Sequence, residues 1–318
     1  MRDYSRRRLL GHGVAALAFA PSFARAAPAP VAPETPPQNG ETIQGSADAQ
    51  RRLTLDVQID GKGPFRFMVD TGADQSVVST EVALALGLIN GNNVLVQDIA
   101  RAVPAPTTVL ENVSIGSIRI DRLTVPILPR QWLGADGYLG LDAVDGKKVT
   151  FDFSHDKLKV DESDTFSSWV HSNETVVRAN GSNGRLTAVS CFVDGVRAYA
   201  FIDSGAQMSI GNTRLFAELQ DRGATYISDF VVPVIGVTGG ESPGRITAVN
   251  DIRLGSLNFL RSTLVIADLQ VFDVWGLSDK PALFIGMNFL RQTSALTIDF
   301  GRRELRFKTA DVKLASRA

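Results

Sequence analysis

From Arg51 onward the chain consists mainly of short apolar, β-branched runs separated by Gly, Asp and Asn. Runs of this length, interrupted by turn residues at regular spacing, predict strands and therefore an all-β fold. Helical spacing appears clearly in only two places, residues 80–86 and 212–220. In the first of these, Thr80 is the expected N-cap and Gly87 the expected stop.

An internal repeat runs through the chain and predicts its organisation. Four segments recur in the same order, and their offset grows from 133 residues at the first segment to 147 at the last, so the second copy is the longer. A period of this length is too long for a solenoid and predicts two similar lobes. The matched pairs are Leu53-Thr54-Leu55 with Leu186-Thr187-Ala188, Ile115-Gly116-Ser117-Ile118 with Leu254-Gly255-Ser256-Leu257, 138–142 with 284–288, and Phe151-Asp152-Phe153 with Ile298-Asp299-Phe300.

Each copy contains one turn that carries an Asp. Phe67-Met68-Val69 leads into Asp70-Thr71-Gly72-Ala73, and Phe201-Ile202 leads into Asp203-Ser204-Gly205-Ala206. In each case an apolar strand delivers a short-stemmed carboxylate to a tight turn, where Gly lets backbone N–H groups approach it. If the turns face each other, the two carboxylates share one site, and the hydroxyl that follows each Asp can hydrogen-bond to the opposite lobe.

Two carboxyl groups in contact provide an acid and a base at the same pH. Ionising both is costly, so one pKa rises and the other falls. The ionised group can take a proton from water while the water attacks a peptide carbonyl, and the protonated group can donate to the carbonyl oxygen. A matched pair of such turns is therefore a candidate hydrolytic centre, whereas one Asp-Thr-Gly alone is often only a turn.

These motifs resemble those of the retropepsin-type aspartic proteases, with both lobes in one polypeptide. Ala after each Gly, at 73 and 206, is typical of retropepsins, and Leu139-Gly140 and Ile285-Gly286 match the hydrophobic-Gly signature that passes behind each catalytic turn. The resemblance covers roughly residues 51–312. It implies two similar β-barrel lobes with a cleft between them and a peptide or protein substrate, with no cofactor, no metal and no need for a homodimer. The implied catalytic residues are Asp70 and Asp203, supported by Thr71, Gly72, Ala73, Ser204, Gly205 and Ala206.

Members of this family cover their cleft with hairpin flaps. In the second lobe the candidate is Val234 to Gly240, with substrate contacts expected from Gly236, Val237, Thr238, Gly239 and Gly240. In the first lobe the matching stretch, Asp98 to Pro106, contains no Gly. We therefore expect one mobile flap and one stiffer wall.

Composition and charge narrow the class of protein. The chain has 318 residues, 44% of them hydrophobic, and a net charge of −1, so it can form a sizeable core and offers no basic surface for nucleic acid. We divide it into an export signal (1–26), a disordered linker or propeptide (27–50), an N-terminal lobe (51–165), an interlobe connection (166–180) and a C-terminal lobe (181–312).

The N-terminus predicts export to the periplasm. Ser5-Arg6-Arg7-Arg8-Leu9 precedes a short Gly- and Ala-rich apolar run that ends at Ala24-Arg25-Ala26, a small-x-small cleavage site. The Arg pair and the mild apolar run favour the twin-arginine route over an ordinary Sec signal. The run is shorter than the roughly 20 apolar residues of a membrane span, although an uncleaved anchor remains an alternative.

The other chemically notable residues are interpreted as structural. Cys191, the only cysteine, lies in an apolar run and is expected to be a buried, unreactive thiol. Trp132 and Trp275 precede the Gly signatures and either wall substrate pockets or pack at the lobe rims. Trp169 is expected to pack between the lobes, and His155 and His171 to lie on the surface. Asp152 and Asp299 are expected at solvated or hydrogen-bonding positions, and no metal-ligand spacing is present.

Three hypotheses follow. The first is a periplasmic aspartic endopeptidase acting on extended peptide segments. The second is a peptide-binding or chaperone module that has the same fold and no turnover. The third concerns activation, with residues 27–50 as a propeptide that the enzyme removes itself.

Overall fold

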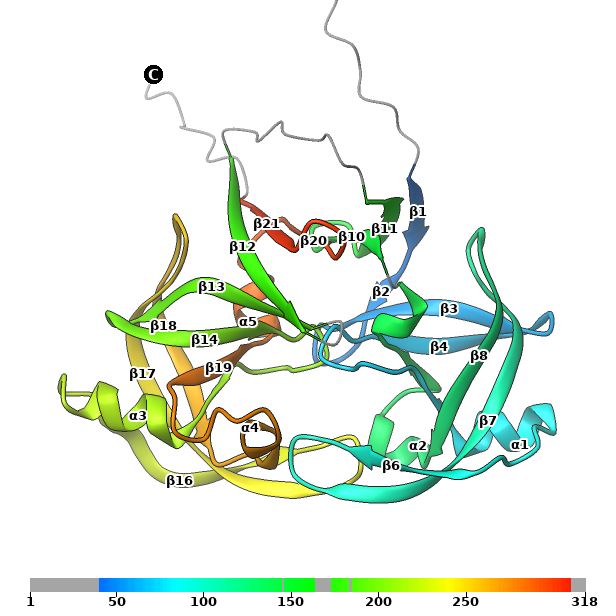
Figure 1. Cartoon of the computed structure of the whole chain (residues 1–318), viewed down its shortest axis with the longest axis horizontal. Coiled ribbons are helices and arrows are strands. Elements are labelled where there is room, and N and C mark those ends of the chain that lie inside the picture. Colours follow the sequence, from blue (N-terminus) through cyan, green and yellow to red (C-terminus); the bar gives the residue numbers. More distant parts are fainter. Residues whose placement is uncertain (1–39, 145, 164–172, 183–184, 310–318) are drawn as a thin grey trace, which may run out of the picture. The chain divides into compact units, whose positions relative to one another are not determined.

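The computed structural model describes residues 40–144, 146–163, 173–182 and 185–309, and Figure 1 shows its elements. The predicted export signal, Trp169 and His171 lie outside the described residues. Strands dominate, as the spacing of apolar runs predicted, and the helices are short.

The first lobe is a closed barrel of six strands, because β3 pairs with both β4 and β7. Two further strands, β2 and β6, extend its sheet. In sheet order the barrel strands are β3 (Leu53–Ile59), β4 (Lys62–Val69), β9 (Gly137–Leu139), β5 (Val77–Ser79), β8 (Ile118–Leu128) and β7 (Ala102–Ile115), and the extensions are β2 (Ser46–Ala47) and β6 (Asn93–Gln97).

The second lobe repeats this barrel, closed by the pairing of β13 with β17. One further strand, β16 (Tyr226–Ile235), extends it beside β17. The prediction of two similar all-β lobes is confirmed. In sheet order the barrel strands are β13 (Arg185–Val193), β14 (Val196–Ile202), β19 (Ala282–Ile285), β15 (Ile210–Gly211), β18 (Leu257–Ala267) and β17 (Glu241–Leu254).

A third layer of six antiparallel strands joins the lobes. Its central strands, one from each lobe, pair so that Thr150 lies opposite Thr297, and their hydroxyls are 2.9 Å apart. These residues are equivalent in the repeat, so the local two-fold relation between the lobes passes through this pair. In order the strands are β1 (Glu41–Gln44), β11 (Lys157–Glu162), β10 (Lys147–Asp152), β20 (Ala295–Asp299), β21 (Glu304–Lys308) and β12 (Glu174–Ser182).

Two expected boundaries are wrong. Residues 41–47 were expected in a disordered linker, yet they form β1 and β2, which pair with β11 and β3. Residues 174–180 were expected in an interlobe connection, yet they belong to β12, which pairs with β21 and β13. Strands β1 and β12 are equivalent in the two copies. Ile43 of β1 pairs with Leu158, Val177 of β12 pairs with Leu305, and these two Leu residues match in the repeat.

Long-range pairing stabilises these short strands, and their local sequence has little apolar content. One signal was present in the sequence. The triplets Glu41-Thr42-Ile43 and Glu174-Thr175-Val176 are similar, and their offset lies within one residue of the one that the strand pairing gives. The repeat therefore begins about ten residues earlier than the sequence analysis placed it.

The local turn and helix predictions are largely confirmed. Asp60-Gly61 and Asp194-Gly195 connect hairpin strands with positive φ at both positions, as a two-residue turn between right-twisted strands requires. The first helix, α1 (Thr80–Leu86), ends at Gly87. Its N-cap is Ser79 and not Thr80, because the Ser79 hydroxyl accepts from the backbone N–H of Val82 at 3.2 Å. The remaining helical segments are α2 (Arg130–Leu133), η1 (Leu141–Ala143), α3 (Thr213–Gln220, capped by Asn212), α4 (Gln270–Val274) and α5 (Met287–Leu290).

The main apolar core is continuous through both barrels and the joining layer. Phe151 in that layer, Phe289 in α5 and Phe307 in β21 are fully buried within it. Burial of a side chain of this size stabilises the fold by about 1.5–3 kcal/mol. In the part of the chain that the structure describes, no helix has the length and apolarity needed to span a membrane.

Candidate active site

Each Asp-containing turn is supported by a strand that runs parallel to the one delivering it. β9 lies beside β4, and the N–H of Asp70 donates to the carbonyl of Leu139 at 3.0 Å. β19 lies beside β14, and the N–H of Asp203 donates to the carbonyl of Ile285 at 3.0 Å. The expectation that the hydrophobic-Gly segments pass behind the turns is confirmed.

Gly is needed in these segments because backbone lies directly against them. A Cβ on Gly140 would be 2.6 Å from the carbonyl carbon of Gln75, and one on Gly286 would be 2.7 Å from the carbonyl oxygen of Met208. Gly in a strand commonly marks such an approach of two backbones. A larger residue at either position would therefore displace the segment that follows the Asp-containing turn.

Two serines that the sequence analysis overlooked complete this support. Ser76 and Ser209 are fully buried, and each is the sixth residue after its Asp. The Ser76 hydroxyl accepts from the N–H of Gly140 at 3.0 Å and donates to Asp142 at 2.6 Å. Ser209 makes the same two bonds, at 2.8 Å each, with the second-lobe Gly and with Asn288. The same residue type at the same place in both copies was the signal that could have identified them.

The hydroxyls of Thr71 and Ser204 tie the two turns together. Thr71 Oγ1 donates to the carbonyl of Ile202 at 2.9 Å and accepts from the N–H of Ser204 at 3.0 Å. Ser204 Oγ donates to the carbonyl of Val69 at 2.8 Å and accepts from the N–H of Thr71 at 3.1 Å. The predicted hydrogen bonds between lobes are thus confirmed, and they fix one turn against the other.

The structure brings together the two predicted carboxyl groups. A Cβ on Gly72 would be 2.9 Å from Cγ of Asp203, and one on Gly205 would be 2.5 Å from Cγ of Asp70. Each carboxyl also accepts from its own turn, Asp70 from Gly72 at 2.8 Å and Asp203 from Gly205 and Ala206 at 2.9 Å. The two side chains hydrogen-bond to each other, so they form one carboxyl pair.

The surroundings make ionisation of both carboxyls costly. Burial, together with the negative charge of Asp70, raises the pKa of Asp203 to about 8, although the N–H donors of its turn oppose the rise. Burial also raises the pKa of Asp70, and the N–H of Gly72 and the positive charge of Arg52 oppose that rise. A pair of this kind holds one proton near neutral pH, which gives it one acidic and one basic member.

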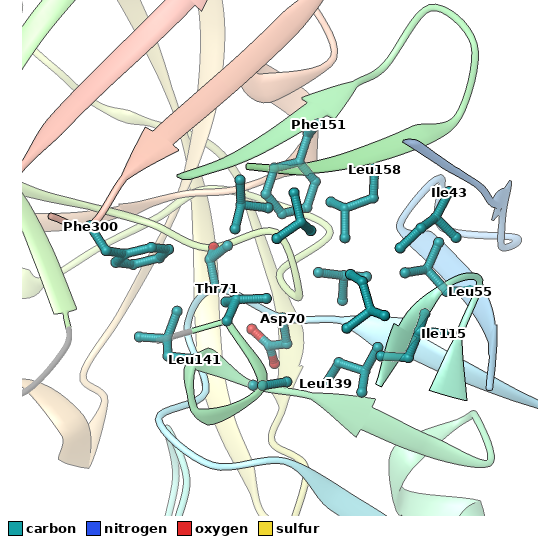
Figure 2. Close-up of a pocket in the computed structure, with 17 residues that line it drawn as sticks. Ile43, Leu55, Asp70, Thr71, Ile115, Leu139, Leu141, Phe151, Leu158 and Phe300 are labelled. Atoms are coloured by element: carbon teal, nitrogen blue, oxygen red, sulfur yellow. The ribbon is translucent and has the colours of Figure 1, made fainter. Parts of the chain in front are cut away.

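Figure 2 shows an apolar cavity of about 20 Å³ behind the first-lobe turn. Asp70 and Thr71 form part of its wall, and the other labelled side chains are Ile, Leu and Phe from the barrel and the joining layer. Such a cavity holds about one water-sized sphere, and an apolar wall gives a water few hydrogen-bond partners. We interpret it as packing space in the core and not as a peptide site.

The predicted second-lobe flap residues form the tip of the β16–β17 hairpin. The N–H of Gly236 donates to the carbonyl of Gly240 at 2.8 Å, and the N–H of Gly239 donates to the carbonyl of Gly236 at 3.0 Å. Gly239 has a φ of 72°, which suits Gly at a hairpin tip. Thr238, between them, is fully buried. The hairpin is confirmed, and its mobility stays a prediction.

The first-lobe stretch that lacks Gly connects β6 to β7 and contacts that tip. Asp98 Oδ1 accepts from the N–H groups of Ala100 at 2.7 Å and Arg101 at 2.8 Å, which closes the loop without Gly. Asp98 Oδ2 accepts from both the N–H and the hydroxyl of Thr238 at 2.7 Å. Arg101 Nη2 donates to the carbonyl of Thr238 at 2.5 Å. One carboxylate therefore orders the first-lobe tip and binds the second-lobe tip.

Apolar side chains cross between the tips as well. Ile99 of the first-lobe tip packs against a buried cluster of the second lobe, and Val237 of the second-lobe tip packs against a buried cluster of the first. The indole of Trp132 lies against Gly239, where a Cβ would come within 2.6 Å of its Nε1. Trp275 packs on Phe201 with ring centroids 4.6 Å apart. Both Trp side chains thus have packing partners, and a contact of either with substrate stays a prediction.

The other residues that the sequence singled out lie away from the Asp pair or have hydrogen-bond and packing partners of their own. Cys191 is fully buried, as expected, and burial raises the pKa of its thiol to about 12. His155 is exposed and its Nδ1 lies 2.8 Å from Asp152, while buried Asp299 accepts from the Ser163 hydroxyl at 2.6 Å. Among the residues that the structure describes, no group of three or more His, Cys, Asp or Glu is arranged to hold a metal ion.

Comparison with known proteins gives one match and one negative result. A family model described as "Aspartyl protease" matches residues 55–143 and 189–289, which together make up more than half of the chain. The two matched regions contain the two Asp turns, the Gly segments behind them and both hairpin tips. No curated protein matches the chain.

Proposed function

Because this chain belongs to the aspartyl protease family, we propose that it is an aspartic endopeptidase whose catalytic pair is Asp70 and Asp203. The observation that carries the proposal is the contact between these two carboxyls. Each lies against the glycine of the opposite turn, and they hydrogen-bond to each other in a buried setting. Burying two carboxyls against each other destabilises the fold, because both cannot be ionised cheaply. An Asp with a purely structural role would gain nothing from such a partner.

The pair supplies both proton transfers of peptide hydrolysis. The ionised carboxyl takes a proton from a water molecule as the water oxygen bonds to the peptide carbonyl carbon, and the protonated carboxyl donates to the carbonyl oxygen. As the tetrahedral intermediate collapses, one of its hydroxyls gives its proton to the carboxyl that is now ionised, the C–N bond breaks, and the leaving amine takes a proton from the other carboxyl. Thr71 and Ser204 touch no substrate in this scheme and act by fixing the separation of the two turns.

The substrate we propose is an extended peptide or protein segment that lies between the Asp turns and the two hairpin tips. An extended peptide commonly binds by pairing its backbone with a strand of the protein that lies beside it. Gly236, Val237, Thr238, Gly239 and Gly240 would then face the peptide from the second lobe. Entry requires the contact between Asp98 and Thr238 to open, because these residues hold the two tips together.

We place this activity in the periplasm. The support is the N-terminal sequence, with its Arg pair, its mild apolar run and its small-x-small site. A propeptide that ended at residue 50 would remove β1, β2 and Asp48 from the fold, so any processing site compatible with this structure precedes Glu41.

The test is cleavage of a peptide library by the purified chain beside Asp70→Asn and Asp203→Asn. We expect both variants to lose at least about 10³-fold in kcat/KM, because acid–base catalysis contributes about 10²–10⁴-fold for each group and the two act together. Asp121→Asn, on an exposed position of β8, is the matched control and should cleave like the wild type. Binding without cleavage by the wild type would favour the peptide-binding module instead.

A further inference from the structure

Arg52 lies at the end of a short segment that precedes the first barrel, and its side chain reaches the second lobe. Its Nη1 donates to the carbonyl of Gly205 at 3.4 Å. Gly205 is the residue against which the Asp70 carboxyl packs. The side chain of Arg52 is only 15% exposed, and its positive charge opposes the rise that burial causes in the pKa of Tyr138 in the first barrel. The guanidinium is therefore held beside the carboxyl pair and shielded from solvent.

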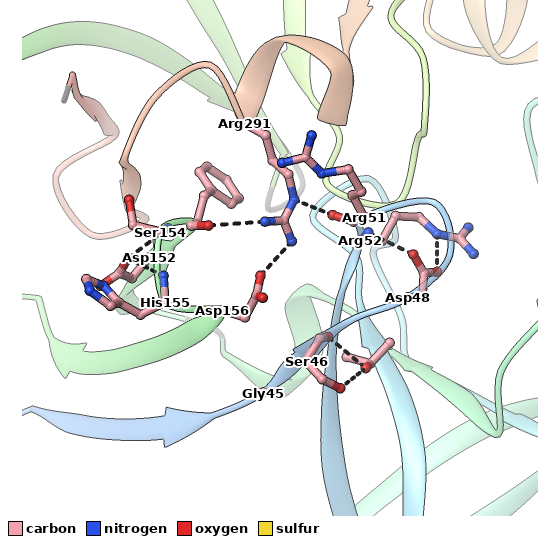
Figure 3. Close-up of polar contacts among 12 residues, drawn as sticks. Gly45, Ser46, Asp48, Arg51, Arg52, Asp152, Ser154, His155, Asp156 and Arg291 are labelled. Atoms are coloured by element: carbon pink, nitrogen blue, oxygen red, sulfur yellow. Dashed lines mark hydrogen bonds and ion pairs between the residues drawn. The ribbon is translucent and has the colours of Figure 1, made fainter.

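Asp48 holds this guanidinium in place, as Figure 3 shows. Its Oδ2 accepts from Arg52 Nε at 2.8 Å, and its Oδ1 accepts from the backbone N–H of Arg52 at 2.8 Å and that of Gln50 at 2.9 Å. The N–H of Asp48 donates to the carbonyl of Arg52 at 3.0 Å. Residues 48–52 thus form a closed loop that the Asp48 carboxylate and backbone hydrogen bonds hold together.

The second lobe fixes the same loop from the other side. Arg291, which follows α5, donates through Nε to the carbonyl of Arg51 at 2.5 Å and through Nη2 to Asp156 at 2.8 Å (Figure 3). Arg51 has a φ of 62°, a conformation that non-Gly residues seldom adopt and that the surrounding contacts must maintain. Contacts from both lobes therefore converge on the residue that precedes Arg52.

The two Asp turns by themselves are nearly equivalent. The N–H of Gly72 donates to Asp70 at 2.8 Å, and the N–H of Gly205 donates to Asp203 at 2.9 Å. The two turns also share the hydroxyl bonds described above. A symmetric arrangement does not decide which carboxyl is ionised. The charged and titratable groups that face Asp70 are Asp203, Arg52 and the Tyr138 phenol. Among these, only Arg52 carries a positive charge.

We propose that Arg52 is a positioning residue that holds the negative charge on Asp70 and so leaves the shared proton on Asp203. This inference rests on the proposed function and assigns the roles within it, with Asp70 as the base and Asp203 as the acid. An opposite charge nearby favours the ionised form of a carboxyl. In agreement, Arg52 lowers the pKa of Asp70, whereas the charge of Asp70 raises that of Asp203.

The first test is the pH dependence of kcat/KM for Arg52→Gln, Arg52→Lys and the wild type. Without the cation, Asp70 holds its proton more tightly, so the acid side of the profile moves to higher pH. We expect kcat/KM of Arg52→Gln at pH 5, relative to its own value at pH 7, to be at least about threefold below the wild-type ratio. Arg52→Lys should restore much of the ratio.

Arg119, at an exposed position of β8, provides the control. Arg119→Gln should leave the acid side of the profile unchanged. A loss in Arg52→Gln by one constant factor at every pH would show a purely structural role and overturn the inference. An equal shift in Arg119→Gln would show that the shift is not specific to the cation beside Asp70 and would also overturn it.

A second measurement does not depend on turnover. In the Asp203→Asn background, Asp70 titrates without its partner, and ¹³C NMR of labelled Asp carboxyls reports its ionisation directly. Adding Arg52→Gln should move the Asp70 titration to higher pH, and an unchanged titration would contradict the inference. If the wild type cleaves no peptide but this shift occurs, the proposed function fails while the electrostatic role of Arg52 stands.

Discussion

Thr238 donates both its backbone N–H and its hydroxyl to the same oxygen of Asp98, each at 2.7 Å, across the two lobes. Thr238 is fully buried at the tip of one hairpin, and Asp98 is buried at the tip of the other. The same carboxyl closes its own loop through Ala100 and Arg101. Separation of the two hairpin tips therefore requires the Asp98 carboxyl to lose both donors of Thr238.

The first prediction concerns this contact. Asp98→Ala should speed amide hydrogen exchange at residues 236–240 by about tenfold or more, since a hydrogen bond to a charged group contributes about 1.5–3 kcal/mol. Thr238→Val keeps the backbone donor and should have a smaller effect. Asp121→Ala, at an exposed position of the first lobe, is the control. Unchanged exchange at the tip in Asp98→Ala would mean that packing of Ile99 and Val237 alone holds the tips together.

The second prediction concerns the pH range of activity. In the proposed mechanism Asp203 holds a proton, and the pKa of this group is raised to about 8 by burial and by the charge of Asp70. We therefore expect kcat/KM to be high near neutral pH and to fall as the pH rises through about 8. Initial rates with one peptide between pH 4 and pH 10 would measure this. A maximum below pH 5 with little activity at pH 7 would contradict it.

The third prediction is the effect of pH on stability. The raised pKa of Asp203 means that the folded protein binds this proton more tightly than the unfolded chain does. The resulting stabilisation is complete below the unfolded pKa near 3.9 and is lost as the pH rises through about 8. Asp203→Asn cannot ionise at this position, so its Tm relative to the wild type should increase between pH 5 and pH 9.

The size of that change can be checked by calorimetry, with a shift of about 2 °C for each kcal/mol in a chain of this length. Asp121→Asn should follow the wild type across the same range. A Tm difference between Asp203→Asn and the wild type that stays constant with pH would show that the carboxyl carries no ionisation cost in the folded state.

The fourth prediction concerns the hydroxyl bonds between the turns. Thr71→Val keeps the shape of the side chain but leaves the N–H of Ser204 and the carbonyl of Ile202 without their partner. Each buried group without a hydrogen bond costs about 1–3 kcal/mol, so urea unfolding should show a loss in this range or above. Thr71→Ser retains the hydroxyl that the second lobe itself uses and should cost far less. Equal losses for the two variants would assign the effect to the methyl group.

The fifth prediction tests export. Replacing Arg6 and Arg7 by Lys keeps the positive charge but removes the Arg pair, so twin-arginine export should stop and the precursor should accumulate inside the cell. Fractionation followed by immunoblotting would measure this. Replacing Arg2 by Lys, outside the motif, is the control. Unimpaired export of the Arg6→Lys/Arg7→Lys variant would indicate the Sec route.

Several features of the site could be predicted from the sequence because they are local. A strand that ends in Asp-Thr-Gly or Asp-Ser-Gly needs only its own residues to form the turn, and the repeat showed that two such turns exist. The hairpins at Asp60-Gly61 and Asp194-Gly195 follow from the backbone freedom of their turn residues. The Gly of each Leu-Gly or Ile-Gly segment marked a close approach, although the partner backbone could not be named.

Other features could not be predicted because they depend on residues far apart in the chain. The sequence around Glu41 carries no strong strand signal, and β1 forms because β11, more than a hundred residues later, offers it a paired edge. The approach of Asp98 to Thr238 and of Arg291 to Arg51 depends in the same way on how the barrels meet. No pattern within either segment indicates these contacts.

By itself, then, the sequence determined the all-β class, the two lobes, the Asp pair and the second-lobe hairpin tip, since each is encoded by residues close together and repeated once. The tertiary structure alone decided the surroundings of the pair: the Ser76 and Ser209 supports, the joined hairpin tips and the position of Arg52. These depend on the distances between side chains from separate strands, and only the closed barrels and the layer that joins them set those distances.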